Sequence, residues 1–458
     1  MKNVSCFLML LLALCCGWSA KAGEYPCEWL SLGVTEDPSS IQRVVWRTSV
    51  DWPVAVAQIA PQTGSPDLVS RARCGTVLSR EYDDYGIRKI YHEATFDGLK
   101  PATEYLYRIG DGGKCWSEWF RFRTAEAGEA RFSMIYMADV QEGTLDQYPR
   151  VVERASAICP EAALWLFTGD LTNDARDDQY TAFFRAHGRV LAERAVAAVP
   201  DNHEYHRNEA GRRDSLVTTW GHLFGRPCNR TPVGLRALGN DCFDYQGCRF
   251  ILLNSRQLED RDSVYTASVL RWTEECLREN PNRWTIVAMH QPFYPIAEGR
   301  SSSLMRRLFQ PLFERWSVDL VLSGHDHVYS RITTPDGRKR TTPVYITSNA
   351  GSQTYAPAYH SYTDRIGSDL QLFQVLDIGP ERLLFSAYDA GGRLYDRIRI
   401  EAKRGGKRLF VEPVAVEEAI ELPSGRRRKY TDEQWLDLEQ RRDGYWNLKN
   451  QQLKKCEK

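Results

Sequence analysis

The chain has few histidines, no net charge and, beyond its first residues, no long apolar run. Only nine of its 458 residues are histidine, and 60 basic residues balance 60 acidic ones. A balanced chain lacks the strong basic character typical of nucleic-acid binding, so no nucleic-acid partner is expected. No segment after residue 22 approaches the roughly 20 consecutive apolar residues of a transmembrane helix. We therefore expect neither a DNA- or RNA-binding protein nor a membrane-spanning one.

Closely spaced cysteine pairs are also absent. The twelve cysteines include no C-x-x-C spacing, so a cysteine zinc site is not expected. Nine of them follow residue 22, and an odd number leaves at least one thiol free or paired between chains. Their scattered positions do not predict which cysteines would form disulfides.

The first 22 residues have the pattern of a signal peptide. Lys2 precedes the apolar stretch FLMLLLALCC, and AKA at residues 20–22 fits a small-x-small cleavage site. The stretch is too short to span a membrane. Cys15 or Cys16 could instead carry a lipid, but Leu14 is bulky for the position before a lipidated cysteine. We expect soluble export to the periplasm, the cell surface or the medium rather than a lipoprotein.

Residues 23–126 indicate a small antiparallel β-sandwich. Segments such as QRVVWRTS and EYLYRIG are short and rich in β-branched and aromatic residues, with Gly, Pro and Asp between them. No useful helical period occurs here, which favours a sandwich. The stretch GLKPATEYLYRIGDGGKCWSEWFRFRT resembles the end of a fibronectin type III domain. AEAGEA, at residues 125–130, is small and polar enough to be a linker.

Residues 127–403 show a different pattern, in which apolar strands alternate with amphipathic helices. Predicted strands include RFSMIYMAD, ALWLFTGD and WTIVAMH. Predicted helices include YPRVVERASAI and one helix over QYTAFFRAHGRVLAERA. This alternation is typical of an α/β domain with helices layered on a sheet. The chain is therefore a multidomain α/β (α+β) protein.

Residues 404–458 form a basic, partly helical C-terminal extension. A helix is predicted from Thr431, because Thr431 and Gln434 fit a capping box. Its apolar residues lie near one face, so we expect the helix to dock on the rest of the protein. These residues are Trp435, Leu438, Tyr445 and Trp446.

Asp, Asn and His residues follow the predicted strands of the α/β domain. In open α/β sheets, ligands bind beyond the carboxyl ends of the strands. Each residue alone has an ordinary explanation, such as a helix cap or a buried histidine, but all of them together indicate metal ligands. The six candidates are Asp139, Asp170, Asn202, His290, His325 and His327.

The donor types indicate the chemistry. Carboxylate and amide oxygens with neutral imidazoles suit Zn, Fe, Mn or Ni rather than Ca or Mg. Six ligands are too many for one tetrahedral metal, so we expect two metals that share a bridging aspartate. Such a pair stabilises both oxygens of a phosphoryl displacement and lowers the pKa of a bound water. The pattern therefore predicts hydrolysis of phosphoesters by a metal-bound hydroxide.

Five ordered motifs make the chain similar to a known family. ADVQ, GDLTND, DNHE, AMHQPFY and GHDH resemble the motifs of the calcineurin-like metallophosphoesterases. With the N-terminal sandwich, residues 25–400 are most similar to the purple acid phosphatase branch. The resemblance implies a four-layer α/β/β/α domain with a dinuclear site. The first metal would be held by Asp139, Asp170 and His327, and the second by the bridging Asp170 with Asn202, His290 and His325. His203 would contact phosphate or donate a proton to the leaving oxygen.

The chain departs from the purple enzymes at several positions. Asn173 stands where they carry the tyrosine whose phenolate colours the ferric site, and Gln141 stands where many members place a histidine. Either amide could still serve as an additional ligand or support one. The metals are therefore expected to be divalent or trivalent transition-metal ions, with Zn, Fe and Mn left open. Asp201 replaces the usual glycine before Asn202, and aspartate tolerates a left-handed backbone better than most residues.

The sequence is compatible with three functions. The leading hypothesis is an exported acid phosphatase-like enzyme that cleaves a phosphorylated small molecule as a monoester. The same site could act on phosphodiesters or nucleotides, since loops such as 204–240 and 293–303 would set the choice. A surface-binding protein with a vestigial site would be expected to lack ligands, yet all six are present. His206 and His360 are expected to be surface histidines, and the pattern predicts no oligomeric state.

Overall fold

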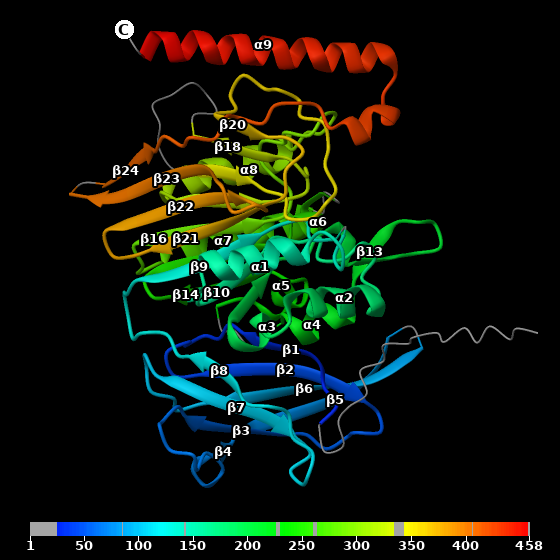
Figure 1. The fold of residues 1–458 in the computed structure, drawn as a ribbon, viewed down its shortest axis with the longest axis vertical. Coiled ribbons are helices and arrows are strands. Elements are labelled where there is room, and N and C mark those ends of the chain that lie inside the picture. The colour runs from blue at the N-terminus through cyan, green and yellow to red at the C-terminus, as the bar shows by residue number, and fades with distance from the viewer. Residues whose placement is uncertain are drawn as a thin grey trace, which may run out of the picture.

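The computed structural model describes residues 25–84, 86–141, 143–225, 230–259, 263–333, 343–404 and 406–456. Figure 1 shows a β-sandwich, an α/β domain and a C-terminal helix arranged along the long axis of the molecule. The predicted signal peptide at residues 1–22 and Cys228 lie outside the described residues. Among the described helices, none is both long enough and apolar enough to cross a bilayer.

The N-terminal region is the predicted sandwich. One sheet contains β1 (Glu28–Gly33), β2 (Gln42–Ser49), β6 (Ile87–Phe96) and β5 (Thr76–Asp84). The other contains β4 (Arg73–Cys74), β3 (Val56–Pro61), β7 (Glu104–Gly110) and β8 (Phe120–Arg123). Alternate residues of each strand face inward, as the pleat requires. Trp46 of β2, Ile59 of β3 and Tyr107 of β7 meet in the core between the sheets.

The sandwich is not a separate module, because one of its sheets continues into the α/β domain. β1 pairs in parallel with β11 (Ala195–Ala198), with Leu32 opposite Ala195. Trp29 stacks on Phe184 of the α/β domain with ring centroids 5.8 Å apart. The predicted linker at 125–130 is also partly packed, since Ala125 is buried and its N–H donates to Pro38 O at 3.0 Å.

The α/β domain has two facing sheets. The eleven-stranded sheet runs β24 (Gly406–Val411), β23 (Leu394–Lys403), β22 (Arg382–Asp389), β21 (Leu372–Ile378), β9 (Phe132–Met137), β10 (Leu164–Phe167) and β11, then the four sandwich strands. The seven-stranded sheet runs β14 (Asp241–Tyr245), β15 (Cys248–Leu253), β16 (Trp284–Met289), β17 (Leu320–Ser323), β19 (Val344–Thr347), β18 (Tyr329–Ile332) and β20 (Arg365–Gly367).

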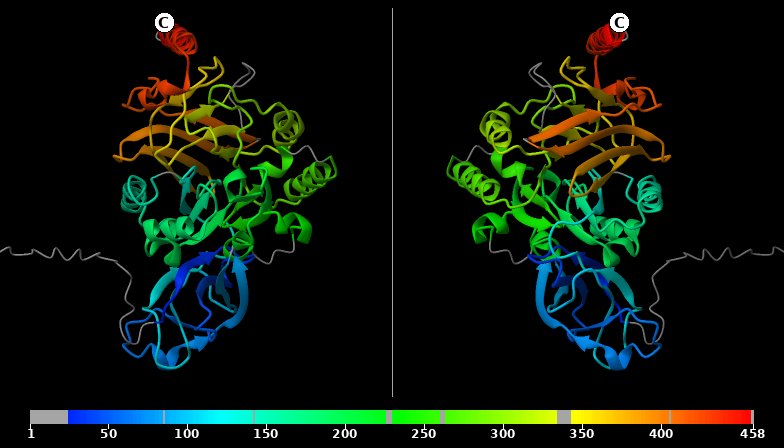
Figure 2. Two further views of the ribbon diagram at one scale, coloured as in Figure 1. Left: turned by 90° about the vertical axis from the view of Figure 1, so that its right-hand side faces the viewer. Right: turned by 90° about the vertical axis from the view of Figure 1, so that its left-hand side faces the viewer.

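Helices cover the outer face of each sheet, and the result is the expected α/β/β/α arrangement. Tyr136 of β9 lies in the core between the sheets, whereas its neighbour Met137 faces the helices. That helical layer contains α1 (Pro149–Ile158) and α2 (Asp177–His187), and the layer over the other sheet contains α7 (Ser263–Arg278) and α8 (Ser303–Arg315). Figure 2 shows the two layers on opposite sides of the domain.

Shorter elements connect these layers. They are η1 (Val69–Arg71), α3 (Val190–Glu193), η2 (Asn202–Glu204), β12 (Tyr205–Arg207), β13 (Arg213–Leu216), α4 (Thr218–Leu223), α5 (Val233–Ala237) and α6 (Ser255–Glu259). The prediction of one helix over QYTAFFRAHGRVLAERA is wrong. α2 ends at His187 because Gly188 takes φ 55°, a left-handed conformation that stops a helix, and α3 begins after it.

The C-terminal extension docks on the α/β domain. It contains η3 (Ser424–Lys429) and α9 (Asp432–Cys456). The predicted capping box is present: Thr431 N–H donates to Gln434 Oε1 at 2.9 Å, and Gln434 N–H donates to Thr431 Oγ1 at 3.2 Å. Leu438 and Tyr445 are buried, so the helix docks as expected, although Trp446 on the predicted apolar face is 37% exposed.

Candidate metal centre

The strand ends bring the predicted ligands to one place. Asp139 follows β9, Asp170 follows β10, and Asn202 begins η2 after β11. His290 follows β16 of the facing sheet directly, and His325 and His327 follow β17. The carboxyl ends of both sheets therefore supply the site, as the rule for open α/β sheets predicts.

The backbone at four of these residues is left-handed. Asp139 and Asp170 have φ 54°, His325 has φ 73° and His327 has φ 50°. Non-glycine residues seldom adopt this conformation, and where they do the strain often accompanies function. Gly169 has φ 83°, and a Cβ there would lie 2.8 Å from His290 Nδ1, so glycine is needed beside this ligand.

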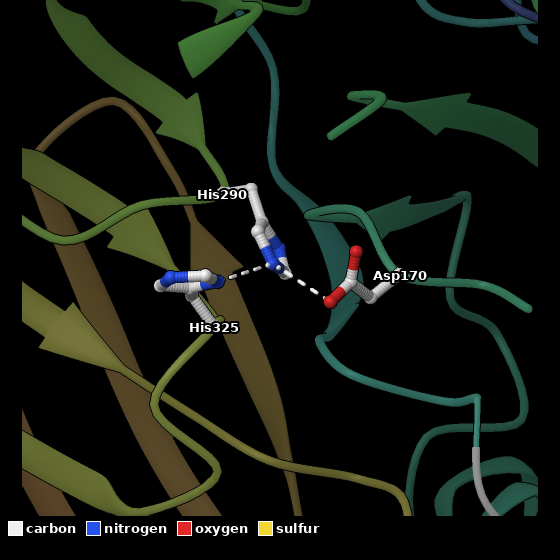
Figure 3. Close-up of side chains that lie close together, drawn as sticks. All are labelled: Asp170, His290 and His325. Carbon is white, nitrogen blue, oxygen red and sulfur yellow. Dashed lines mark hydrogen bonds and ion pairs between the residues drawn. The ribbon is translucent and has the colours of Figure 1, made fainter. Parts of the chain in front are cut away.

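One group of candidate ligands surrounds His290. Its Nε2 lies 3.0 Å from Asp170 Oδ2 and 3.2 Å from His325 Nδ1, as Figure 3 shows. The potential donor atoms of Asp170, His290 and His325 all lie within 4.8 Å of one another. The separation is small enough for one ion to contact all three.

A second group shares Asp170 with the first. The potential donor atoms of Asp139, Asp170 and His327 also lie within 4.8 Å of one another. His327 Nε2 is 3.7 Å from Asp139 Oδ1. Because Asp170 belongs to both groups, its carboxylate could be shared by two ions.

Unpaired buried oxygens show that the site suits cations. Among the described residues, Asp139 Oδ2, Asn202 Oδ1 and Gln141 Oε1 are buried and accept no hydrogen bond. A buried acceptor left without a partner costs free energy, so such atoms in a folded protein call for an explanation. Metal coordination would supply one. Asn202 is held in place through its carbonyl oxygen, which accepts from Arg213 Nη1 at 2.5 Å.

The imidazoles are oriented as metal ligands usually are. His290 Nδ1 lies 2.6 Å from Thr168 O, and His327 Nδ1 lies 3.1 Å from Gln353 O. In each case the backbone carbonyl accepts from the Nδ1–H, so the other ring nitrogen, Nε2, faces the site. His325 is held differently: its N–H donates to Asp139 Oδ1 at 2.9 Å, and its carbonyl accepts from Arg300.

Burial and crowding shift the ionisation of the site. Burial raises the pKa of Asp139 to about 8, opposed by His290 and reinforced by Asp170. Burial would also raise the pKa of Asp170, but His290 and His203 outweigh it and hold that pKa well below its usual value. Burial lowers the pKa of His327 to about 3. Burial would lower the pKa of His290, but Asp170 and Asp201 outweigh it and raise that pKa well above its usual value. The side chains together offer carboxylate oxygens and imidazole nitrogens, a donor set that favours transition metals.

Glu204 organises the loops around Asp170, a role that the sequence reading did not predict. Its carboxylate accepts from the N–H groups of Asp170 at 3.1 Å, Leu171 at 2.8 Å and Asp201 at 3.0 Å. Glu204 ends the DNHE motif, and its position three residues after Asp201 completes a capping box. That spacing was the signal available in the sequence.

The expectation for Asp201 is wrong. Its φ is −148° and its ψ is −156°, so the backbone is extended rather than left-handed. Asp201 caps η2 instead: its Oδ1 accepts from Asn202 N–H at 2.8 Å, and its Oδ2 accepts from Ser255 Oγ–H at 2.6 Å. Aspartate is therefore present for its carboxylate rather than for its tolerance of a positive φ.

The two amides that depart from the family pattern lie next to each other. Asn173 Nδ2 donates to Gln141 O at 3.4 Å, so the Asn173 side chain is directed at backbone. Gln141 Nε2 lies 3.4 Å from His327 Nε2. The nitrogen and oxygen of an amide exchange places by a half-turn of the side chain. Gln141 can thereby present its unpaired oxygen to an ion on His327.

His203 lies at the edge of the centre. Its Nδ1 is 2.5 Å from Asn173 O, and its Nε2 is 3.8 Å from Asp170 Oδ2. The His203 side chain is 21% exposed, whereas His290 is fully buried. His203 is therefore accessible from solvent while still facing the shared aspartate.

Phe293 and two further histidines lie apart from the centre. Phe293 is buried and stacks on Phe313 of α8, so it faces the helical layer. His360 is half-buried and stacks on Tyr362 with centroids 4.8 Å apart, and His206 is half-buried in β12. Neither histidine belongs to the two ligand groups.

Comparison with known proteins identifies both domains. Residues 133–329 match the family described as calcineurin-like phosphoesterase, and residues 28–124 match the purple acid phosphatase N-terminal domain. The chain therefore contains a calcineurin-like metallophosphoesterase domain and a purple acid phosphatase N-terminal domain. The recognition made from the five motifs is confirmed. The finer resemblance of the sandwich to fibronectin type III stays a prediction.

Individual relatives agree with this assignment. The phosphoesterase is 24% identical to purple acid phosphatase 21 of Arabidopsis thaliana over 65% of this chain and 66% of the relative. It is 28% identical to human acid phosphatase type 7 over 72% of this chain and 76% of the relative. The solved structure of the purple acid phosphatase PPD1 from yellow lupin seeds shares the fold, with a TM-score of 0.66 and 16% identity over 82% of this chain and 74% of that one. The chain spans about half to two thirds of the length of the first three curated relatives it matches.

Proposed function

We propose that this phosphoesterase is an exported, dinuclear metal-dependent phosphohydrolase that cleaves phosphomonoesters. The observation that carries the proposal is the pair of ligand groups that share Asp170. Two ions bridged by one carboxylate are the arrangement that phosphoryl displacement uses. The relatives named as acid phosphatases support the choice of reaction.

The ligands divide between the two ions. The first ion would be held by Asp139, Asp170 and His327, with Gln141 as a further oxygen donor, and the second by Asp170, Asn202, His290 and His325. When bound, the ions supply Lewis-acid stabilisation of the phosphoryl oxygens and a water of lowered pKa. The unpaired Oδ2 of Asp139 and Oδ1 of Asn202 support this division, since each ion then receives one of them.

In this proposal, His203 gives a proton to the leaving oxygen. The carbonyl of Asn173 accepts its Nδ1–H, so Nε2 points toward the shared aspartate. Arg213 holds the same carbonyl at 2.9 Å and also the carbonyl of Asn202, which fixes the loop that carries His203. The substitution of tyrosine by Asn173 leaves this backbone contact intact, because it uses the main chain.

Export and substrate preference depend on residues outside the two ligand groups. Export rests on the leader pattern at residues 1–22. A phosphodiester or nucleotide substrate uses the same ions, so the loops beyond them decide the preference. A vestigial site is disfavoured, because all six candidate ligands are present and the donor atoms of five of them gather in two groups at the ends of both sheets.

Hydrolysis of p-nitrophenyl phosphate by metal-loaded protein tests the proposal. Rates should be compared with bis(p-nitrophenyl) phosphate and a nucleoside monophosphate after loading with Zn, Mn or Fe. We expect the monoester to be cleaved fastest. Faster cleavage of the diester would reassign the substrate class, and no cleavage of any ester in any metal form would refute the proposal.

A further inference from the structure

A cluster of positive charge surrounds Tyr355 beside the metal centre. The Tyr355 ring lies 4.7 Å from the ring of His327, a candidate ligand of the first ion. Arg300 Cζ lies 5.0 Å from the Tyr355 centroid, Arg426 Cζ lies 4.9 Å and Lys429 Nζ lies 6.0 Å. Three cations therefore lie within cation–π distance of one ring beside the candidate ligands.

The cluster joins two distant parts of the chain. Arg300 lies between β16 and α8 and bonds to the carbonyl of His325, so it is tied directly to the metal centre. Arg426 and Lys429 belong to η3 of the C-terminal extension. Arg426 Nε–H donates to Thr354 O, next to Tyr355 in the chain. The extension thus delivers basic groups to the rim of the site.

Two of these cations lack a carboxylate partner. Arg300 pairs with Asp326 at 3.0 Å, but within the described residues neither Arg426 nor Lys429 forms a salt bridge. Like charge accumulates here instead, since Arg426 and Arg428 lower the pKa of Lys429. Uncompensated positive charge that a fold holds together is poised to attract an anion.

The separations limit which anion fits. Arg426 is no more than about 10 Å from the His327 ring, because the two successive separations are 4.7 and 4.9 Å. A phosphoryl group at the ions could therefore belong to a molecule whose second phosphate reaches Arg426 and Lys429. A sugar bisphosphate, whose phosphates are several bonds apart, can span a separation of this size, and pyrophosphate tests whether directly linked phosphates suffice.

We infer that the phosphoesterase prefers small molecules with two separated phosphates, one bound at the ions and the other at Arg426 and Lys429. Tyr355 forms the floor between the two positions. This inference rests on the proposed function, which supplies the cleaved phosphate. Arg426 and Lys429 act as specificity residues and take no part in the bond cleavage.

Kinetics with matched sugar phosphates test the inference. The substrates are fructose 1,6-bisphosphate, fructose 6-phosphate and pyrophosphate, and the variants are Arg426→Gln/Lys429→Gln and the charge control Arg80→Gln, exposed on β5 of the sandwich. We expect the double variant to raise KM about 10-fold for the bisphosphate, the effect of about 1.4 kcal/mol of lost binding. In the double variant, KM for the other two substrates should change by less than about twofold. Arg80→Gln should leave KM unchanged for all three substrates. Equal changes for all three substrates, or no change, would overturn the inference.

A binding measurement separates this inference from the proposed reaction. Calorimetry with zinc-loaded protein can compare 1,4-butanebisphosphonate with butylphosphonate, neither of which is hydrolysed. Wild type should bind the bisphosphonate about 10-fold tighter, and the double variant should bind both equally. Selective binding by a protein that hydrolyses no ester would uphold the second phosphate position while refuting the reaction. Equal binding by wild type would refute the second phosphate position whatever the activity.

Discussion

The sandwich and the α/β domain share a sheet, yet the surroundings of a buried histidine differ between them. His92 of the sandwich is 1% exposed, and both its nitrogens are paired, with Thr48 Oγ1 at 2.9 Å and Ser79 Oγ at 2.8 Å. His290 of the α/β domain is equally buried, but its Nε2 faces Asp170 and a second imidazole. The first arrangement completes a fold, whereas the second leaves donor atoms directed at a common point.

The difference indicates a binding site in the α/β domain, because unpaired oxygens and left-handed backbone occur there together. A polar group that serves only the fold is expected to be satisfied, because an unpaired buried group is costly. In the metal centre, Asp139 Oδ2 and Asn202 Oδ1 are buried and unpaired, and the backbone of Asp139 is left-handed. Unpaired acceptor oxygens and local backbone strain occur together in this centre. They indicate that the missing partner of these oxygens comes from outside the chain.

Removing the shared carboxylate should have the largest effect. Asp170→Ala should abolish phosphatase activity and reduce metal content at both positions, since one side chain serves two ions. Elemental analysis and activity should be measured on the same preparation. Asp377→Ala provides the control. Asp377 lies on β21, pairs with Arg131 and belongs to neither ligand group. Full metal occupancy with retained activity in Asp170→Ala would contradict a dinuclear centre.

Removing the partly exposed histidine should leave the metals in place. His203→Ala should retain both ions but slow turnover roughly 10²–10⁴-fold, the usual effect of losing a general acid. The loss should be smaller for esters with good leaving groups, which need less protonation. Steady-state rates across a series of aryl phosphates measure this dependence, with His206→Ala as the control. A loss independent of the leaving group would instead make His203 a phosphate-binding or orienting residue.

His92 of the sandwich should make the stability of the fold depend on pH and not on metal. Burial lowers the pKa of His92 to about 4, below the ordinary value of 6.5. The folded state therefore resists protonation, so its stabilisation is complete above pH 6.5 and is lost as the pH falls toward 4. This one residue should cost about 2 kcal/mol of unfolding free energy between pH 7 and pH 5.

Denaturant unfolding at pH 7 and pH 5 checks this value. His187 contributes a similar acid sensitivity, because burial also lowers its pKa to about 4. His92→Gln should therefore remove only part of the pH dependence and should leave metal content unchanged. A pH dependence identical to that of wild type would show that His92 is not held neutral in the folded state.

The candidate ligands could be predicted from the sequence because each lies within a few residues of a strand end. His290 comes immediately after β16, and its apolar run marks the strand clearly. Residues whose position depends on long-range packing could not be predicted in this way. Tyr355 and Arg426 meet only because the C-terminal extension returns across the domain, and no spacing encodes that contact. The parallel pairing of β1 with β11 was missed for the same reason, since it joins segments about 160 residues apart.

Substitution of Asn173 should have the smallest effect. Asn173 distinguishes this centre from that of the purple enzymes, and changing it removes none of the six candidate ligands. Its side chain is a neutral amide that bonds to Gln141 O, so no phenolate is present at this position to give a charge-transfer band. Protein purified with iron should therefore lack purple colour. A neutral amide also stabilises a trivalent ion less than an anionic oxygen does, so the first position should accept Zn, Mn or Fe(II). A visible spectrum with parallel elemental analysis measures both properties.

Tyr355 provides the matching control for that spectrum. Its ring lies 4.7 Å from that of His327, and its hydroxyl accepts from Gln353 Nε2 at 2.6 Å. If iron-loaded wild type shows a strong band in the middle of the visible range, another phenolate reaches the metal and the assignment at the first position is wrong. Loss of that band in Tyr355→Phe would identify the phenolate as Tyr355. Without such a band in wild type, Asn173→Tyr should introduce one on loading with ferric iron, provided that the ring fits beside Gln141. Colour gained at position 173 and metal content unchanged would show that this single side chain separates the two kinds of centre.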